Sequence, residues 1–162
     1  MPKFTALAQD LHITRAEARQ YMDSYLERFS GVRAYMKETV EKAKRDGYAV
    51  TMFGRRRYLP ELQSKNFNLR SFGERVALNM PVQGTAADIM KLAMVRVYAR
   101  LQAELPEARL LLQVHDELIA ECPEDLAERC AHILEEEMSA AARLDVPLLA
   151  EAHTGLSWYD AK

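Results

Sequence analysis

The chain has no apolar run long enough to cross a bilayer. A membrane helix needs about 20 consecutive apolar residues, and charged residues interrupt every such stretch of this 162-residue sequence. The N-terminus also lacks the basic segment followed by an apolar one that marks a secretory signal. These absences predict a cytoplasmic protein that does not have the membrane as a partner.

Cysteine is scarce as well, with only Cys122 and Cys130. The two residues do not form a Cys-x-x-Cys pair, and no histidine lies near them at the spacing of a zinc site. They are interpreted as reduced structural thiols. The sequence contains no internal repeat and no low-complexity linker. With 49% hydrophobic and 28% charged residues, it predicts one globular unit that spans residues 1–162.

The net charge is only −2, which argues against a general nucleic-acid coat, but the charges are unevenly distributed. Residues 42–75 contain nine Lys or Arg and three acidic residues, whereas residues 121–151 contain nine acidic residues and two Arg. A protein that presents one basic face to a polyanion has this asymmetry. Two solvated charged surfaces would have it too.

Apolar periodicity predicts helices over residues 4–11, 16–29, 32–45, 69–79, 86–105 and 125–142. Short extended segments are expected over residues 48–53, 58–60 and 146–152, with a hairpin over 110–121. Thr14 and Glu17 have the spacing of a capping box, Gly47 is placed to end a helix, and Pro81 is expected to interrupt one. The predicted fold class is α+β, with helices packed on a small antiparallel sheet that carries this hairpin.

The most informative segment is this hairpin, whose two apolar runs meet at His115, Asp116 and Glu117. Apolar residues alternate on one face of the first run: Leu110, Leu112 and Val114. Histidine and aspartate tolerate left-handed backbone better than most residues, so both suit a tight turn. Two adjacent carboxylates on a rigid turn can hold a divalent metal, although a solvated hairpin end is the plain alternative.

An arginine triplet follows a turn at Gly54 and comprises Arg55, Arg56 and Arg57. Guanidinium groups bind phosphate oxygens well, so the triplet suits contact with a nucleic-acid backbone. Isolated triplets of this kind are also common on protein surfaces.

A second polar set lies on the expected helix before Pro81. Arg75 and Asn79 are four residues apart on one face, and Arg70 lies about a turn and a half earlier, so they could follow a phosphate backbone and a groove edge. Asn79 and Gln83 flank the proline, where their amides could equally act as local helix caps.

Two other function classes remain open at this stage. Residues 7–17 resemble a helix-turn-helix, which predicts a non-catalytic DNA-binding module. However, the turn carries His12 where glycine is usual, and the next helix offers few side chains that read bases. An HD-type metal phosphohydrolase would use His115 and Asp116, but the remaining histidines, His132 and His153 among them, do not form a convincing ligand set.

Three segments together resemble bacterial family A DNA polymerases: residues 54–60 (GRRRYLP), 74–88 (ERVALNMPVQGTAAD) and 113–117 (QVHDE). Their order and spacing match the family, and the resemblance extends from about residue 4 to residue 162, including GLSWYD at 155–160. It implies a DNA-directed DNA polymerase of replication and repair, represented by its C-terminal part. Residues to about 50 would be fingers-derived helices, and residues from about 51 part of the palm.

The resemblance also implies roles for single residues. Asp116 corresponds to a metal-ligating palm aspartate and Glu117 to its acidic neighbour, so both are assigned to catalysis and to metal binding. The implied DNA-binding residues are Arg55, Arg56, Arg57, Arg70, Arg75, Asn79, Gln83, Gln113 and His115. The expected cofactor is Mg²⁺, and the expected partners are primer-template DNA and deoxynucleoside triphosphates.

Some parts of the family are not found in the sequence. The first catalytic motif, a strand-borne Asp-Tyr-Ser block, has no counterpart, since the superficially similar residues 23–28 lie inside an expected helix. The nucleotide-binding fingers helix, the thumb and an exonuclease domain are not found either. We therefore expect the isolated chain to be inactive without the N-terminal part of a polymerase. Its hairpin should expose an unpaired sheet edge through which the chain self-associates.

Overall fold

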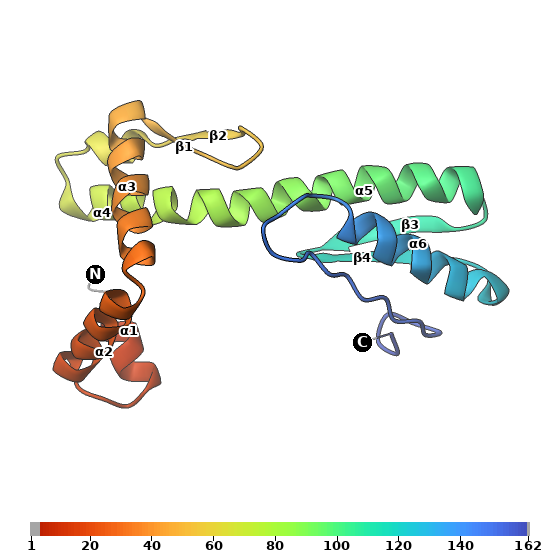
Figure 1. Ribbon diagram of the computed structural model, residues 1–162, viewed down its shortest axis with the longest axis horizontal. Coiled ribbons are helices and arrows are strands. Elements are labelled where there is room, and N and C mark those ends of the chain that lie inside the picture. The colour runs from red at the N-terminus through yellow and green to blue at the C-terminus, as the bar shows by residue number, and fades with distance from the viewer. Residues whose placement is uncertain (1–3, 162) are drawn as a thin grey trace. The chain divides into compact units, whose positions relative to one another are not determined.

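The computed structural model describes residues 4–161. They form two compact units, one ending at Gly84 and the other beginning at Thr85 (Figure 1). Helices predominate, and each unit contains a two-stranded antiparallel sheet, which confirms the α+β class. No helix among residues 4–161 is long and apolar enough to span a bilayer. The expected single unit over residues 1–162, and its fingers-to-palm boundary near residue 50, stay predictions.

The first unit is built from helices around a small sheet. Its elements in order are α1 (Phe4–Asp10), α2 (Arg15–Arg28), α3 (Ser30–Asp46), β1 (Tyr48–Val50), β2 (Arg56–Tyr58), the 3₁₀ helix η1 (Pro60–Gln63), α4 (Phe67–Asn79) and the π-helical turn η2 (Met80–Gly84). Their order along the chain can be followed in Figure 1 from red to yellow-green.

Two helix ends form as their sequences predict. At the start of α2, the Glu17 amide donates to Thr14 Oγ1 (3.2 Å) and the Thr14 amide donates to Glu17 Oε2 (2.9 Å), which completes the capping box. The Thr14 amide and hydroxyl both donate to the Glu17 carboxylate, and these two hydrogen bonds hold the pKa of that carboxyl below its usual value. Helix α3 ends at Gly47, whose φ of 79° is left-handed backbone that favours glycine.

The core of the first unit consists mostly of small side chains. Its buried members are Ala43, Ala49, Leu59, Leu62 and Ala77, with Val76 and Met80 packed against them. Small residues let helices approach closely, and Gly73 of α4 shows how closely. A Cβ at Gly73 would lie 3.1 Å from the side chain of Leu62 and 3.2 Å from its backbone nitrogen. This packing holds α4 against η1 and thereby positions the polar face of α4.

The structure corrects two details of the first unit. The helix expected over residues 69–79 begins two residues earlier, at Phe67, because the Asn66 side chain accepts hydrogen bonds from the amides of Asn68 and Leu69. The first strand ends at Val50, and Arg56 and Arg57 lie in β2, which begins earlier than expected. Pro81 interrupts the α-helix as predicted, because α4 ends at Asn79. It lacks an amide donor and its ring crowds the preceding turn, and the chain accommodates it in the π-helical turn η2.

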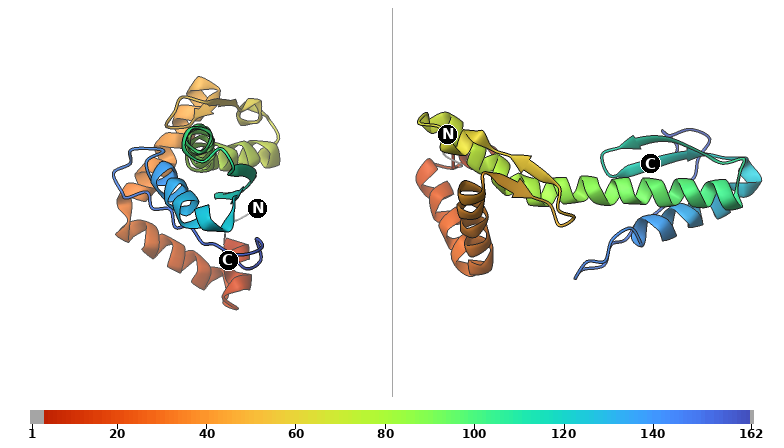
Figure 2. Two further views of the ribbon diagram at one scale, coloured as in Figure 1. Left: turned by 90° about the vertical axis from the view of Figure 1, so that its right-hand side faces the viewer. Right: turned by 90° about the horizontal axis from the view of Figure 1, so that it is seen from above.

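The second unit packs a hairpin and a helix along one long helix. Its elements are α5 (Thr85–Glu104), β3 (Arg109–Val114), β4 (Glu117–Glu121), the 3₁₀ helix η3 (Glu124–Leu126) and α6 (Ala127–Ser139). Both the hairpin and α6 lie beside α5 (Figure 2). The buried core is Val97, Leu101, Leu105, Ala108, Cys130 and Ile133, and from the hairpin Leu110, Leu118 and Ala120 pack against it. The hairpin is thus held by the α5 and α6 core.

Both cysteines belong to this second unit and are free thiols. Cys130 is buried in the core and Cys122 packs against it. Burial, with a smaller contribution from the Cys122 thiol, raises the pKa of Cys130 to about 11. The thiol therefore stays protonated at neutral pH and serves as a small apolar core residue.

The acidic face of α6 is partly neutralised from α5. The Arg100 guanidinium lies 2.6 Å from a carboxylate oxygen of Glu136, 2.9 Å from one of Glu104 and 3.1 Å from one of Glu137. Hydrogen bonds from Arg100 lower the pKa of Glu104 and of Glu136, and those carboxylates raise the pKa of Arg100. Part of the acidic charge therefore ties α6 to α5 instead of facing water alone.

The expected last strand over residues 146–152 is wrong, because this segment has no ladder partner. Its backbone amides bond instead to side chains of α6. Ala150 donates to Ser139 Oγ (3.0 Å) and Ala152 donates to Glu135 Oε1 (2.9 Å). A strand needs a neighbouring strand with free backbone groups, and this segment has none. Helix α6 also ends at Ser139, earlier than residue 142.

Candidate functional site

The tip of the β3–β4 hairpin is a two-residue loop. Val114 pairs with Glu117, and His115 and Asp116 form the loop between them. His115 has a φ of 52°, which confirms left-handed backbone at this position. Positive φ at the first loop residue only is the sign pattern of a type II′ turn. The Gln113 side chain donates to the His115 carbonyl oxygen (2.5 Å), so it braces the loop.

A β-bulge interrupts the strand that leads to this tip. The register shifts between Leu110 and Leu112, which leaves Leu111 as the extra residue. The expected alternation is therefore wrong for Leu112, whose side chain is 53% exposed, while Leu110 packs on the core. Bulges increase strand twist and re-aim the residues beyond them. Here three residues separate the bulge from the loop of His115 and Asp116.

Asp116 and Glu117 are adjacent and exposed at this tip. Carboxylate oxygens are the ligands that Mg²⁺ prefers, so their chemistry suits the expected cofactor. However, residues 4–161 bring together no group of three or more His, Cys, Asp or Glu side chains that could hold a metal ion. The two carboxylates alone do not fit a complete magnesium site. The HD-type alternative needs a larger cluster, which the described residues do not supply.

The arginine triplet of the first unit is divided between two faces. In the β1–β2 ladder, Arg56 lies opposite Val50 and Arg57 opposite Ala49, so their side chains leave opposite faces of the ribbon. The Arg56 guanidinium stacks 4.8 Å from the ring centre of Tyr48, which holds it along the sheet. All three arginines of the triplet are exposed. The triplet therefore places positive charge on both faces of the β1–β2 hairpin.

The polar residues of α4 and η2 differ in their surroundings. Arg70 is half-buried and donates to the Ser64 carbonyl (3.0 Å), a contact that secures the start of α4. Arg75 is exposed, with Ser71 Oγ at 3.4 Å and the ring centre of Phe72 at 5.8 Å. Asn79 and Gln83 are also exposed. The geometry gives Arg70 a structural contact, whereas the other three are accessible to a ligand.

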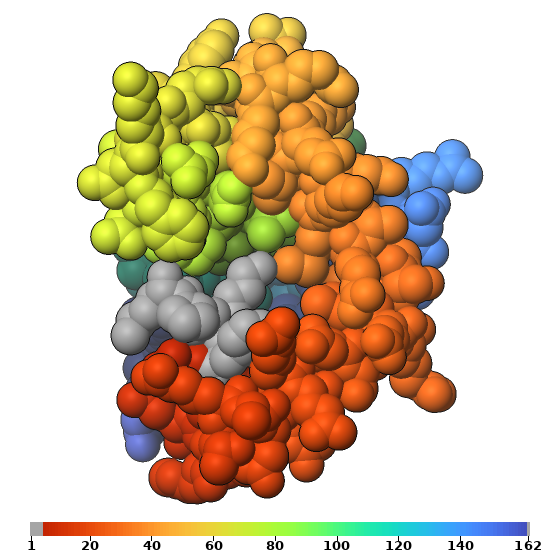
Figure 3. Space-filling model, turned by 90° about the vertical axis from the view of Figure 1, so that its left-hand side faces the viewer, coloured from red at the N-terminus to blue at the C-terminus, as the bar shows by residue number. Residues whose placement is uncertain are grey.

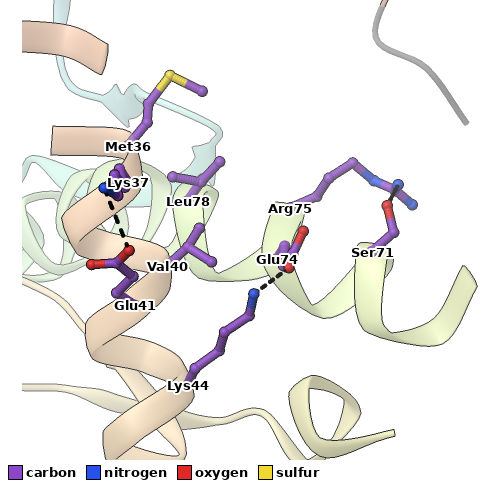
Figure 4. A pocket seen from close by; sticks show the side chains of 9 residues that line it. All are labelled: Met36, Lys37, Val40, Glu41, Lys44, Ser71, Glu74, Arg75 and Leu78. Atoms are coloured by element: carbon purple, nitrogen blue, oxygen red, sulfur yellow. Dashed lines mark hydrogen bonds and ion pairs between the residues drawn. The ribbon is translucent and has the colours of Figure 1, made fainter. Parts of the chain in front are cut away.

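A groove of about 330 Å³ lies between α3 and α4 beside Arg75. Its lining residues are Met36, Lys37, Val40, Glu41 and Lys44 of α3, and Ser71, Glu74, Arg75 and Leu78 of α4 (Figure 4). Lys44 Nζ lies 2.5 Å from a carboxylate oxygen of Glu74, an ion pair that joins the two helices. Figure 3 shows the orange surface of α3 beside the yellow-green surface of α4.

Sequence reasoning missed this groove and the Lys44–Glu74 ion pair. The two residues are 30 positions apart, and no local pattern pairs them. The i, i+4 apolar pair of Met36 and Val40 marks one wall, but a helix face buried in a core has the same spacing. The contact between Thr51 and Gly84, which are 33 positions apart, also has no local pattern in the sequence.

The predicted site residues are divided between the two units. The first unit holds Arg55, Arg56, Arg57, Arg70, Arg75, Asn79 and Gln83, and the second holds Gln113, His115, Asp116 and Glu117. Their assignments to DNA, metal and catalysis stay predictions.

Known proteins resemble this chain over nearly its whole length. DNA polymerase I of Bacillus subtilis (strain 168) is 54% identical and that of Bacillus caldotenax 53% identical, each over 156 residues that make up 96% of this chain and 18% of the relative. Among solved structures, the POL domain of Pol1 from M. smegmatis, in complex with DNA primer-template and dNTP, is 46% identical with a TM-score of 0.92, covering 98% of this chain and 28% of that chain. The chain therefore spans less than a fifth of the length of these two relatives.

The sequence profile of DNA polymerase family A matches residues 3–160. This match includes residues 7–17, so it also accounts for the segment that resembles a helix-turn-helix. The resemblance seen in the three sequence blocks is confirmed, and the chain belongs to DNA polymerase family A.

Proposed function

We propose that this chain contributes the DNA-holding surface and one catalytic carboxylate pair of a DNA-directed DNA polymerase in the bacterial cytoplasm. The observation that carries the proposal is the hairpin tip, where Asp116 lies exposed in a braced two-residue loop and Glu117 lies exposed beside it at the start of β4. Membership of family A supports it, because the M. smegmatis relative is described with DNA primer-template and dNTP. Primer-template DNA and deoxynucleoside triphosphates are therefore the proposed partners.

The first unit is proposed to hold the DNA backbone. Its exposed arginines and the amides of Asn79 and Gln83 supply the donors that phosphates and groove edges accept. His115 is proposed to lie at the primer end, since its left-handed backbone places it beside Asp116 at the apex of the hairpin. Gln113 is proposed to contact DNA and also to hold the loop through its hydrogen bond to the His115 carbonyl.

The carboxylates of Asp116 and Glu117 are proposed to supply oxygen ligands to Mg²⁺, and the remaining ligands would come from groups outside residues 4–161 or from the nucleotide. Because the described residues offer only this pair, we expect the chain by itself to bind DNA without extending it.

The test measures primer extension with Mg²⁺ and four deoxynucleoside triphosphates beside fluorescence-anisotropy binding to the same primer-template. Wild type should bind and not extend. Asp116→Ala should bind within about threefold of wild type, because a metal ligand at the tip contributes little to holding the duplex. Extension by wild type that Asp116→Ala abolishes would contradict the expected inactivity, whereas no binding at any salt concentration would contradict the DNA-holding role.

We also propose that the isolated chain self-associates through the hairpin. Strands β3 and β4 pair only with each other among the described residues, and Leu111 and Leu112 of β3 are 50% and 53% exposed. An unpaired edge beside exposed leucines is a template for a second strand. Size-exclusion chromatography with light scattering should show a dimer that Leu112→Lys disrupts. A monomer at all concentrations would count against the proposal.

A further inference from the structure

Gly84 ends the π-helical turn η2 against the turn that follows β1. A Cβ atom built on Gly84 would lie 2.7 Å from Thr51 Cγ2 and 3.0 Å from Met80 Cε and Sδ. Carbon atoms at ordinary contact are about 3.5 to 4.0 Å apart, so the position has room only for glycine while Thr51 stays in place. The Met80 atoms are the far end of a flexible side chain, whereas the Thr51 methyl group is fixed at χ1 by branching at Cβ.

The other side of Thr51 holds the turn that leads to the arginine triplet. The Gly54 amide donates to the Thr51 carbonyl (3.0 Å), and the Thr51 amide donates to the Arg55 carbonyl (3.0 Å). The Arg55 amide in turn donates to Thr51 Oγ1 (3.2 Å). Thr51 is 5% exposed. One buried side chain thus uses its hydroxyl to shape the arginine turn and its methyl group to contact Gly84.

We propose that Thr51 and Gly84 form a positioning contact that fixes the Arg55 turn relative to the π-helical turn carrying Gln83. The contact joins two segments that are 33 positions apart in sequence and that both carry candidate DNA-binding residues. It sets the spacing at which Arg55 and Gln83 meet one duplex. This inference rests on the proposed DNA-holding role of the first unit, and neither Thr51 nor Gly84 itself needs to touch DNA.

The arrangement explains why these two residue types occur here. Serine at position 51 would keep the hydroxyl acceptor for Arg55 and remove the methyl group that a Cβ at position 84 would strike. Valine at 51 would keep the methyl group and remove the acceptor. Alanine at 84 would push Thr51 and therefore the turn. The pair Thr51→Ser and Gly84→Ala should accordingly compensate each other.

The experiment combines these variants in a double-mutant cycle with two measurements. The rate of amide hydrogen exchange at Gly54 and Arg55 measures how stably the turn is formed. The affinity for primer-template DNA as a function of salt measures whether the position of the turn matters for DNA binding. Gly84→Ala should speed exchange at both amides by about tenfold and weaken binding by about the same factor, with a shallower salt dependence. Thr51→Ser keeps the hydroxyl acceptor but loses the contacting methyl group, so it should speed exchange and weaken binding less than Gly84→Ala does. Thr51→Ser with Gly84→Ala restores a carbon at the contact and should recover to within about threefold of wild type.

Gly31→Ala is the matched control, because a Cβ at Gly31 meets nothing within 4 Å. It should leave exchange at Gly54 and Arg55 and DNA binding unchanged. If Gly84→Ala does not fold, Thr51→Val takes its place, since losing the acceptor should speed exchange at Arg55 and weaken binding with Gly84 untouched.

Two outcomes would overturn the inference. One is a Gly84→Ala protein in which the amides of Gly54 and Arg55 exchange as slowly as in Gly31→Ala. The other is a double variant in which neither the exchange rates nor the DNA affinity return toward wild type. If the wild-type chain binds no DNA, the proposed function fails, yet the exchange cycle still decides whether the contact positions the turn.

Discussion

Replacing the arginine triplet by alanine is expected to weaken binding of primer-template DNA by about 100-fold at low salt. Arg55, Arg56 and Arg57 are all exposed on the β1–β2 hairpin, and each guanidinium can neutralise one phosphate. Each lost phosphate contact lowers the slope of log affinity against log salt by about one. The slope of the triple variant should therefore fall by about two to three. Fluorescence anisotropy at several salt concentrations measures both quantities.

The matched control removes the same charge from another exposed surface, by Arg15→Ala, Arg19→Ala and Arg28→Ala on α2. It should leave the salt slope within about one of wild type. Equal losses in the two triple variants would mean that the triplet acts only through net charge, and the proposed interface would be wrong.

Single variants of the triplet distinguish its two faces. Arg56 stacks over Tyr48, while Arg57 lies opposite Ala49 on the other face of the ribbon. A duplex lying along one face contacts one of the two guanidinium groups. We therefore expect Arg56→Ala and Arg57→Ala to differ by about tenfold in affinity, and the stronger effect identifies the face that holds DNA.

Leu101→Ala is expected to lower the free energy of unfolding of the second unit by about 3 kcal/mol. Leu101 is 1% exposed in the core of α5 and α6, against which the hairpin packs through Leu110 and Leu118. Truncation leaves a cavity that close-packed neighbours fill only partly. The hairpin packs on this core, so loosening the core should also destabilise the hairpin and its tip. Urea unfolding followed by fluorescence of Trp158, the one tryptophan of the sequence, measures the change.

Leu92→Ala is the matched control on the same helix, since Leu92 is 38% exposed. It should cost less than about 1 kcal/mol, because a partly solvated side chain loses less transfer free energy and leaves no cavity. Equal losses for the two variants would show that Leu101 does not belong to the core that supports the hairpin.

The parts of the fold that could be predicted from sequence depend on neighbours along the chain. The capping box of Thr14 and Glu17 and the left-handed end at Gly47 involve residues within one turn. The loop at His115 and Asp116 followed from two apolar runs that meet at polar residues. Family membership, too, could be read from three sequence blocks, and the match over residues 3–160 confirms it.

The errors occurred where distant parts of the chain decide the local structure. The bulge at Leu111 shifts the pairing of β3 with β4, and residues 146–152 form no strand, with two of their amides donating instead to Ser139 and Glu135. In each case more than one local conformation satisfies the sequence pattern, and contacts from other elements select one.

The sequence by itself determined the helices, the hairpin with its carboxylate tip and the family, because periodicity, capping and turn chemistry act over a few residues. Only the tertiary structure decided that Arg56 and Arg57 face opposite ways, that Arg70 secures a helix start, and that Lys44 pairs with Glu74 across a groove. It also decided that the Thr51 methyl group meets Gly84. These contacts join residues that are distant in the sequence. They form only when the fold brings their elements together, and close packing then allows only side chains that fit the space between those elements.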